Sequence, residues 1–180
     1  MRPRLSACAI LAGTIAGLFF SLTAADARPL CEDSSRACLI SAAEAYIDAL
    51  VVSHDGADVP LAPDVRRTEN GLVNANGEHE VRASFSETKM VRDRRNLRFV
   101  VDEMQGEIVA YFLIDVVLAG PEQSETKAGD KRYKVAVSVP AGIYTVHEAE
   151  RFKVEHGLIK EIEIIAHVEK GAGGASGWPD

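Results

Sequence analysis

The stretch that decides the fold lies near the C-terminus, where residues 143–168 read IYTVHEAERFKVEHGLIKEIEIIAHV. Two strand-like segments, Ile143–Val154 and Ile159–Val168, are separated by His156-Gly157, which is typical of a tight turn. The pattern predicts a β-hairpin that closes a sheet and has one face of each strand buried.

Further strands are predicted upstream of this hairpin. Leu97–Met104 precedes a turn at Gln105-Gly106, and the almost wholly apolar run Ile108–Leu118 is expected of a strand covered on both faces. Lys134–Val139 alternates polar and apolar residues, which predicts another strand. The polar segment Gly120–Asp130 is predicted to be an exposed loop.

Helices are predicted in the first part of the chain. Apolar residues recur at three- and four-residue intervals from Ser35 to Ser53, which predicts a helix ended by Asp55-Gly56. Residues 56–80 contain many turn formers and are expected to be loop and hairpin, with a strand-like piece at Val65–Glu69 and a turn at Asn76-Gly77.

A second, short helix is predicted within residues 80–95, where Val81 and Phe85 could face a core. Helices therefore come first and an antiparallel sheet follows. This order predicts an α+β fold with the helices packed on one face of the sheet.

The N-terminus has the three parts of an export signal. Arg2 and Arg4 precede an uncharged run from Ala7 to Leu22, and Ala25–Ala27 is a small-x-small cleavage site. We expect a signal peptide at residues 1–27, cleavage near Ala27 and a secreted or periplasmic protein without a stable membrane anchor. An uncleaved anchor is the alternative, but the apolar run is shorter than the ~20 residues that span a bilayer.

Removal of the signal would leave one domain at residues 28–170 and a Gly-rich tail at 171–180 that is expected to be flexible. The full chain carries a net charge of −7, and loss of the leader makes it more negative by one. Nucleic acid is not expected as a partner of so acidic a chain.

The exported part keeps two cysteines, Cys31 and Cys38, which could form a disulfide in an oxidising compartment. Such a bond requires Cys31 to precede the helix that holds Cys38, since two residues seven apart in one helix lie ~10 Å apart. Two free thiols are the alternative. Neither the cysteines nor any other motif predicts a metal site or a cofactor.

Two motifs carry a resemblance to a known superfamily. A helix followed by a polar hairpin with Thr68-Glu69-Asn70-Gly71, and a last hairpin from Arg151 to Glu163, resemble the nuclear transport factor 2-like superfamily and within it the SnoaL-like branch. The resemblance covers residues 36–168. The chain is also similar to a family of exported proteins of this fold in which Ala49-Leu50 and His54 precede that run.

The resemblance implies a cone-shaped α+β roll, in which a strongly bent antiparallel sheet wraps around N-terminal helices and leaves an apolar pocket at the wide end. Members of the superfamily include cofactor-free isomerases, lyases and hydrolases, and others are only binding or dimerisation modules. A homodimer through the outer face of the sheet is implied for this chain. The segment Glu78–Val81 departs from the exported relatives, which often have a Trp there.

Asp115 is the charged residue within the apolar run Ile108–Leu118. Burial would raise the pKa of its carboxyl, which suits a general acid or base near neutral pH. The alternative is a structural acid paired with an Arg or Lys of a neighbouring strand.

The strand Ile143–Val154 has two faces, and only one can line a pocket. If the face with His147 and Arg151 lines it, His147 can move protons and Arg151 can bind developing negative charge. If the face with Tyr144, Val146, Glu148, Glu150, Phe152 and Val154 lines it, both are surface residues. Tyr46 on the first helix is predicted to point inward and to donate its hydroxyl to a substrate, or to be a core residue.

The expected catalytic residues are thus Asp115, His147 and Tyr46. On the closing strand, Glu163 and His167 share a face that could meet the pocket or form a dimer contact, and Glu69 could join the pocket rim. The expected substrate-binding residues are Tyr111, Arg151, His54, Asn70, Arg67 and His167.

The hypothesis is a cofactor-independent lyase or isomerase that uses acid–base chemistry on a small, apolar molecule, which could be aromatic, with epoxide or ester hydrolysis as a less favoured reaction. A non-catalytic ligand-binding or dimerisation module is the alternative. The non-catalytic module becomes the more favoured hypothesis if Tyr46, Asp115 and His147 do not converge on one cavity.

Overall fold

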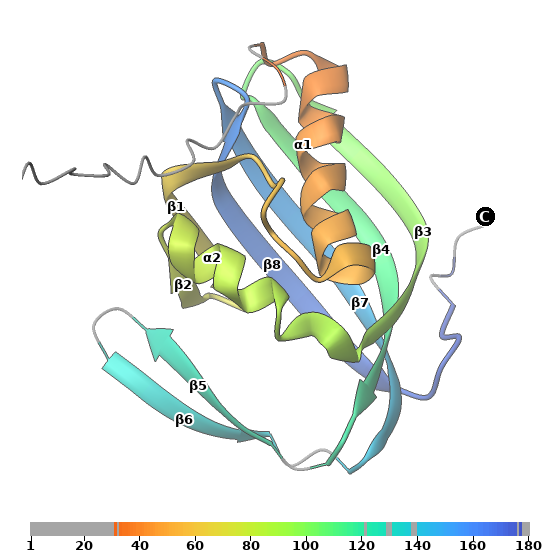
Figure 1. Cartoon of the computed structure of the whole chain (residues 1–180). Coiled ribbons are helices and arrows are strands. Elements are labelled where there is room, and N and C mark those ends of the chain that lie inside the picture. Colours follow the sequence, from red (N-terminus) through yellow and green to blue (C-terminus); the bar gives the residue numbers. More distant parts are fainter. Residues whose placement is uncertain are drawn as a thin grey trace, which may run out of the picture.

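A six-stranded sheet curves around one long helix in the computed structural model (Figure 1). The structure describes residues 31, 33–120, 122–128, 131–137, 140–175 and 177, so the predicted signal peptide lies outside the described residues. The strands of the large sheet are β1 (Leu61–Glu69), β2 (Leu72–Asn76), β3 (Val91–Asp102), β4 (Glu107–Leu118), β7 (Gly142–Glu155) and β8 (Leu158–Lys170).

The strands of this sheet lie in the order β2-β1-β8-β7-β4-β3. Neighbouring strands are antiparallel except for β1 and β8, which are parallel, with Arg67 opposite Ile162. The prediction of a wholly antiparallel sheet is wrong at this pair. Residue periodicity reveals which face of a strand is buried, but it carries no information on which strands are neighbours or on their direction.

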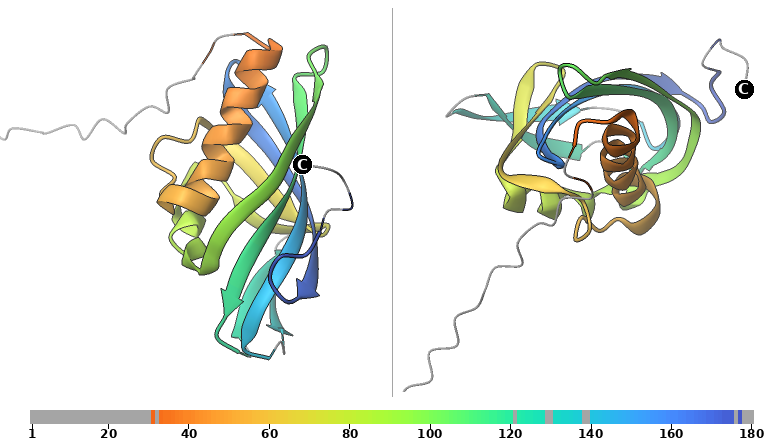
Figure 2. Two further views of the ribbon diagram at one scale, coloured as in Figure 1. Left: turned by 90° about the vertical axis from the view of Figure 1, so that its right-hand side faces the viewer. Right: turned by 90° about the horizontal axis from the view of Figure 1, so that it is seen from above.

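The sheet bends strongly, and seen from above it wraps around helix α1 (Figure 2). Helix α1 (Arg36–Asp48) lies in the concave side, and helix α2 (Glu78–Phe85) packs beside β1 and β2. This is the predicted α+β class, with the helices on one face of a curved sheet. No helix within the described residues is long and apolar enough to cross a membrane.

A separate hairpin formed by β5 (Glu122–Ala128) and β6 (Lys131–Val137) follows β4 and lies beside β2. The prediction of an exposed loop at Gly120–Asp130 is therefore wrong, because most of that segment is strand β5. Strand β6 overlaps the predicted strand Lys134–Val139, whereas β5 is polar and pairs with β6 through backbone hydrogen bonds. Hydropathy does not detect a polar strand such as β5.

Helix α1 begins where the cap-like residues predict. The Ser35 hydroxyl accepts a hydrogen bond from the Cys38 amide at 3.4 Å, and Cys31 precedes the helix. The predicted Cys31–Cys38 disulfide is present, with Cα atoms 5.7 Å apart. After Asp48 the predicted helix continues as a π-helical turn, Ala49–Ser53, and ends at His54 in the left-handed conformation.

The second helix is shorter than predicted. It ends at Phe85, a single 3-10 turn follows at Thr88–Met90, and strand β3 starts at Val91. The β1–β2 hairpin turns at Asn70-Gly71, where both residues have positive φ, and the predicted turn at Asn76-Gly77 is the junction between β2 and α2.

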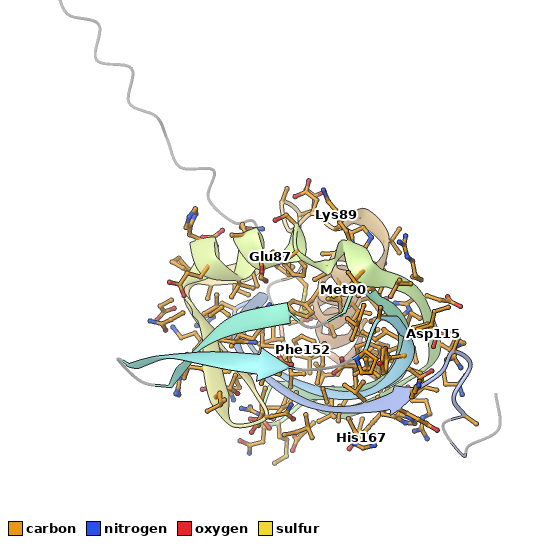
Figure 3. All side chains as sticks on the ribbon, turned by 90° about the horizontal axis from the view of Figure 1, so that it is seen from below. Glu87, Lys89, Met90, Asp115, Phe152 and His167 are labelled. Carbon is orange, nitrogen blue, oxygen red and sulfur yellow. A yellow bond between two sulfur atoms is a disulfide. The ribbon has the colours of Figure 1, made fainter. Side chains whose placement is uncertain are left out.

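Aromatic side chains fill the space between α1, α2 and the sheet. The Tyr46 ring meets the rings of Phe85 and Phe152 edge to face, with centroids 5.1 Å apart in both pairs. Figure 3 shows Phe152 inside the curve of the sheet and His167 outside it. The inner faces of β4, β7 and β8 therefore belong to the core and their outer faces do not.

Candidate functional site

Strand alternation along β7 decides which of its side chains enter the molecule. Tyr144, Val146, Phe152 and Val154 are buried against the core. The face that the sequence left as an alternative is thus the inner one. It brings Glu148 and Glu150 inside as well, and the residue exposure of Glu150 is only 1%.

These two glutamates are acids in an apolar setting. One carboxyl oxygen of each, Oε2, is buried and has no hydrogen-bond partner among the described residues. Burial raises the pKa of Glu148 to about 8, with a further contribution from Glu69, and burial together with Glu148 raises the pKa of Glu150 well above its usual value. Both carboxyls therefore favour the protonated form at neutral pH.

Arg67 lies on the inner face of β1 and is held by neutral groups from three elements. Its Nε donates to Asn74 Oδ1 at 2.9 Å, and its Nη1 donates to Ser84 Oγ at 2.7 Å and to the Tyr46 hydroxyl at 3.3 Å. Asn74 in turn donates to Glu69 Oε2 at 2.8 Å. Burial alone would lower the pKa of Arg67, but Tyr46 and the nearby carboxyls raise it, so the guanidinium stays charged.

Tyr46 reaches the same place from α1. Burial raises the pKa of its phenol to about 12, with Arg67 opposing the shift, so the hydroxyl keeps its hydrogen. That hydroxyl accepts from Arg67 and donates to none of the described residues. It is thus available as a hydrogen-bond donor.

We call the polar residues that meet at this place the inner cluster: Tyr46, Arg67, Glu69, Asn74, Ser84, Glu148 and Glu150. It runs from the exposed Glu69 through the half-buried Arg67 and Glu148 to the buried Glu150. It combines two protonatable carboxyls, one fixed cation and one phenol, which together can donate, accept and stabilise charge.

Asp115 lies on the outer face of β4. Its carboxylate accepts hydrogen bonds from Arg95 and Thr145, both at 2.8 Å, and from the Gly173 amide at 3.4 Å. Burial would raise the pKa of Asp115, but the hydrogen bonds from Thr145 and Arg95 and the charge of Arg95 outweigh it and lower the pKa. The prediction of a raised pKa is wrong, and the alternative of an ion pair with a neighbouring strand describes this residue.

Two of the expected site histidines face away from the core. His147 lies opposite His167 across β7 and β8, with ring centroids 6.1 Å apart, and its Nε2 is 3.2 Å from Glu169 Oε2. Both share the outer side of the sheet with Asp115. The structure therefore does not bring Asp115 and His147 together with Tyr46.

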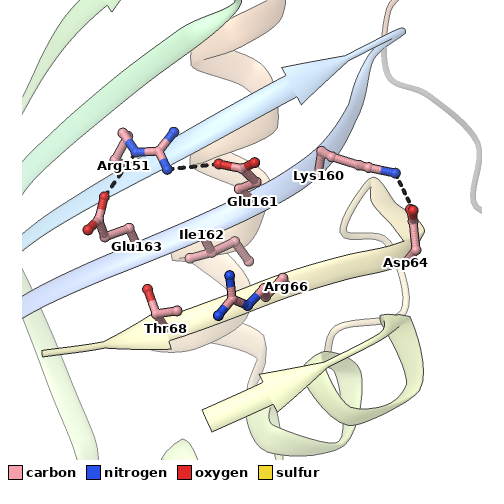
Figure 4. A pocket seen from close by; sticks show the side chains of 8 residues that line it. All are labelled: Asp64, Arg66, Thr68, Arg151, Lys160, Glu161, Ile162 and Glu163. Atoms are coloured by element: carbon pink, nitrogen blue, oxygen red, sulfur yellow. Dashed lines mark hydrogen bonds and ion pairs between the residues drawn. The ribbon is translucent and has the colours of Figure 1, made fainter. Parts of the chain in front are cut away.

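Arg151 also lies on the outer face, in a groove of about 340 Å³ between β1, β8 and β7 (Figure 4). Its guanidinium pairs with Glu107, Glu161 and Glu163 at 3.2, 2.9 and 3.1 Å. Each nitrogen of the Arg151 guanidinium is thus already paired with a carboxylate on the outer face, which differs from the expected role in binding a substrate oxyanion.

Three other expected binding residues do not join the inner cluster. Tyr111 is on the outer face, 40% exposed, beneath the Arg98 guanidinium at 5.8 Å. His54 ends the first helical segment and contacts the Thr88 hydroxyl at 3.1 Å. Asn70 forms the β1–β2 turn and accepts from the Ala166 amide at 3.1 Å, so its role here is structural.

Sequence reasoning identified Tyr46 and Arg67 but assigned no role to Glu148, Glu150, Asn74 or Ser84. A signal for the two glutamates was present. The face they share contains Tyr144 and Phe152, whereas the opposite face contains Thr145 and His147, so the number of large apolar residues could have identified the inner face. Asn74 and Ser84 have no comparable signal, because their role depends on contacts between separate elements.

Comparisons with known proteins agree with this fold. A family model described as "Domain of unknown function (DUF8021)" matches residues 32–166. No curated protein matches the sequence.

Solved structures share the architecture at low sequence identity. An epoxide hydrolase/cyclase-like enzyme of salinomycin formation, SalBIII, superposes with a TM-score of 0.55 at 10% identity over 77% of this chain and 99% of its own. A limonene-epoxide-hydrolase-like epoxide hydrolase of M. tuberculosis gives 0.51 at 14% over 73% and 84%. TsrD of Streptomyces laurentii gives 0.51 at 20% over 75% and 90%. These likenesses confirm the predicted fold class.

Proposed function

Because this chain belongs to the DUF8021 family, whose description names no activity, we propose a function from the inner cluster itself: a cofactor-independent lyase or isomerase that moves protons on a small, largely apolar molecule. One observation carries the proposal. Two carboxyls with raised pKa, Glu148 and Glu150, face a phenol and a fixed guanidinium inside a curved sheet. A raised pKa together with specific charged neighbours is characteristic of catalytic acids and bases.

Each member has a distinct chemical role. Glu148, with a pKa of about 8, removes a proton from the carbon next to a substrate carbonyl and returns it to a neighbouring atom. The neutral Glu150 and the Tyr46 hydroxyl donate hydrogen bonds to the oxygen that gains negative charge. Arg67 supplies the fixed positive charge. Asn74 and Ser84 hold its guanidinium in place.

The test measures proton exchange and does not require the natural substrate. Small carbonyl compounds, beginning with phenylacetone and phenylpyruvate, are incubated with the protein in D₂O, and deuterium at the α-carbon is followed by NMR. We expect Glu148→Gln to reduce the protein-dependent exchange by about 10²–10⁴-fold. The exchange rate should rise as the pH approaches the pKa of Glu148.

Outer-face variants are the matched controls for this test. Asp115→Asn and His147→Gln change ionisable groups that the structure places away from the inner cluster, and both should leave the exchange unchanged. Loss of exchange in either of them, or full exchange in folded Glu148→Gln, would contradict the assignment.

A second candidate is a binding module without turnover. It is favoured because Tyr46, Asp115 and His147 do not converge, and because a ligand donor could equally satisfy the unpartnered Oε2 atoms of Glu148 and Glu150. Saturable binding of a small molecule that depends on Tyr46 and Glu150, with no exchange in any compound tested, would select this candidate.

We propose that the protein is exported and cleaved near Ala27. The charged, apolar and small-residue segments of residues 1–27 support this, as does the Cys31–Cys38 disulfide, since disulfides persist in oxidising compartments. N-terminal sequencing of protein from the secreted or periplasmic fraction should start at Arg28. A mature chain that starts at Met1 would refute the proposal.

A homodimer is proposed through the outer face of the sheet. Exposed apolar side chains support it, among them Tyr111, Ile143 and Ile165, which are 40%, 49% and 54% exposed. Sedimentation equilibrium should give twice the chain mass for the wild type and the chain mass for Ile165→Glu. A monomeric wild type at all concentrations would exclude the dimer.

A further inference from the structure

The Arg67 guanidinium is a half-buried positive charge whose hydrogen-bond partners among the described residues are all neutral. It bonds to an amide oxygen of Asn74 and to the hydroxyls of Ser84 and Tyr46. Its Nη2 donates to none of the described residues, and no ion pair joins Arg67 to any carboxylate among them. Charges buried in proteins are normally paired, because an isolated one loses its hydration without compensation.

The neighbouring carboxyls do not supply the missing partner. Glu148 and Glu150 are held in the protonated form by burial and by each other, and neither contacts Arg67 within ion-pair distance. Glu69 lies at the exposed end of the cluster, and its Oε2 is already bonded to the Asn74 amide. At neutral pH the inner part of the cluster thus has one cation and no anion in contact with it.

We propose that the ligand brings the missing charge: the inner cluster binds a small organic carboxylate, one oxygen of which accepts a hydrogen bond from Arg67 Nη2. The Arg67 Nη2 group donates to none of the described residues and can give a carboxylate oxygen a charge-assisted hydrogen bond, which is stronger than a bond between neutral groups. The apolar part of the ligand is expected against the aromatic inner face of the sheet, where Phe112 lies directly opposite Glu148. The inference rests on the proposed function for the location of the site and specifies its substrate class.

The test compares two probes of nearly equal shape, benzoate and benzamide, by isothermal titration calorimetry near pH 7. Benzoate should bind at least about tenfold more tightly than benzamide, because one charge-assisted hydrogen bond distinguishes the two probes. Arg67→Met should remove this preference, and Arg67→Lys should keep part of it, since the charge remains but the fork geometry is lost.

The adjacent Arg66 offers a matched control. It has the same charge but is exposed and lines the outer groove between β1 and β8 (Figure 4), so Arg66→Met should leave the benzoate preference unchanged. Equal binding of both probes, the same preference in folded Arg67→Met, or no measurable binding of benzoate to the wild type would overturn the inference.

Binding is measured here without turnover, so the two proposals can fail separately. An Arg67-dependent preference for benzoate in a protein that exchanges no α-proton would keep the ligand class and refute the acid–base function. Glu148-dependent exchange of phenylacetone without any preference for benzoate would keep the acid–base function and refute the carboxylate ligand class.

Discussion

Glu148 and Glu150 show how a strand can bring ionisable groups into a core by alternation alone. Both occupy inward positions between Val146 and Phe152, so burial follows from their place on β7, and the raised pKa of each follows from burial. Keeping them ionised lowers the stability of the fold, which makes their protonation measurable.

The raised pKa of Glu148 predicts a loss of stability as the pH rises. Below its unfolded-state pKa of 4.5 the carboxyl is protonated in both states. Between that value and about 8 it ionises only in the unfolded chain, so the free energy of unfolding falls across this window. Glu148→Gln removes the effect and should gain on the order of 1 kcal/mol or more over the wild type at about pH 8.

Urea denaturation at about pH 5 and about pH 8 measures this difference. The advantage of the variant should be small at the lower pH and largest at the higher one. Parallel pH dependences for the wild type and Glu148→Gln would show that the carboxyl is not buried as described.

The lowered pKa of Asp115 predicts the opposite pattern, a loss of stability as the pH falls. Its pKa lies below the ordinary 3.8, so the stability it contributes is present above that value and is lost as the pH falls through the folded-state pKa. Asp115→Asn keeps an oxygen acceptor but removes the negative charge that faces Arg95, and it should cost about 1 kcal/mol at neutral pH. Guanidinium denaturation checks the loss, and a variant as stable as the wild type would contradict a structural role.

At the residue scale the sequence indicates only part of the inner cluster. Tyr46 and Arg67 follow from a helical apolar face and from a polar hairpin beside it. A lone acid in an apolar strand suggests desolvation and favours a pocket position for Asp115, but the outer side of that strand is covered by Arg95 and by the tail at Gly173. Partners that come from distant parts of the chain decide such cases, and periodicity does not contain them.

Among the elements, α2 connects the loop after the first helix to the inner cluster. Arg82 donates to the backbone oxygens of Gly56, Ala57 at 3.1 Å and Val59 at 2.9 Å, and Ser84 on the same helix holds Arg67. The position of the Arg67 guanidinium therefore depends on how α2 is docked.

Arg82→Met should undock this end of α2. Three backbone oxygens lose a charged donor, so we expect a cost of about 2–3 kcal/mol and a lower melting temperature, measured by circular dichroism. Glu78→Gln is the control, because it removes only the i,i+4 pair with Arg82 and should cost no more than about 0.5 kcal/mol. Equal effects of the two variants would show that the backbone contacts contribute little.

The sequence largely predicts whether a segment is a helix or a strand, but it does not predict which strands are neighbours in the sheet. The first helix, the strands β4, β7 and β8 and their turns follow from periodicity and from Gly at positions with positive φ, such as Gly106 and Gly157. Strand β5 was not predicted because it is polar, whereas β6 overlaps the predicted strand Lys134–Val139. The parallel pairing of β1 with β8 was not predicted, because the residue pattern of a strand does not indicate which strand lies beside it in the sheet.

For the whole molecule, the Cys31–Cys38 disulfide ties Cys31, which precedes α1, to the first turn of that helix. A loop closed by residues seven apart should contribute about 2 kcal/mol through the entropy of the unfolded chain. Reduction with dithiothreitol should lower the melting temperature by several degrees, and the Cys31→Ser, Cys38→Ser double variant should melt with the reduced protein and be insensitive to the reductant. No change on reduction would show that the bond is absent or without effect.

The parallel pairing of β1 with β8 has a consequence for biosynthesis. Tyr46 and Arg67 belong to the first part of the chain made by the ribosome, and Glu148 and Glu150 to one of the last, but β1 reaches β7 only through β8. A nascent chain that stops before Leu158 has every residue of the inner cluster but lacks the strand that joins β1, and with it Arg67, to β7. On the proposed function, activity therefore arises late, with the final strand, and a product truncated there should be inactive even though its sequence retains every residue of the inner cluster.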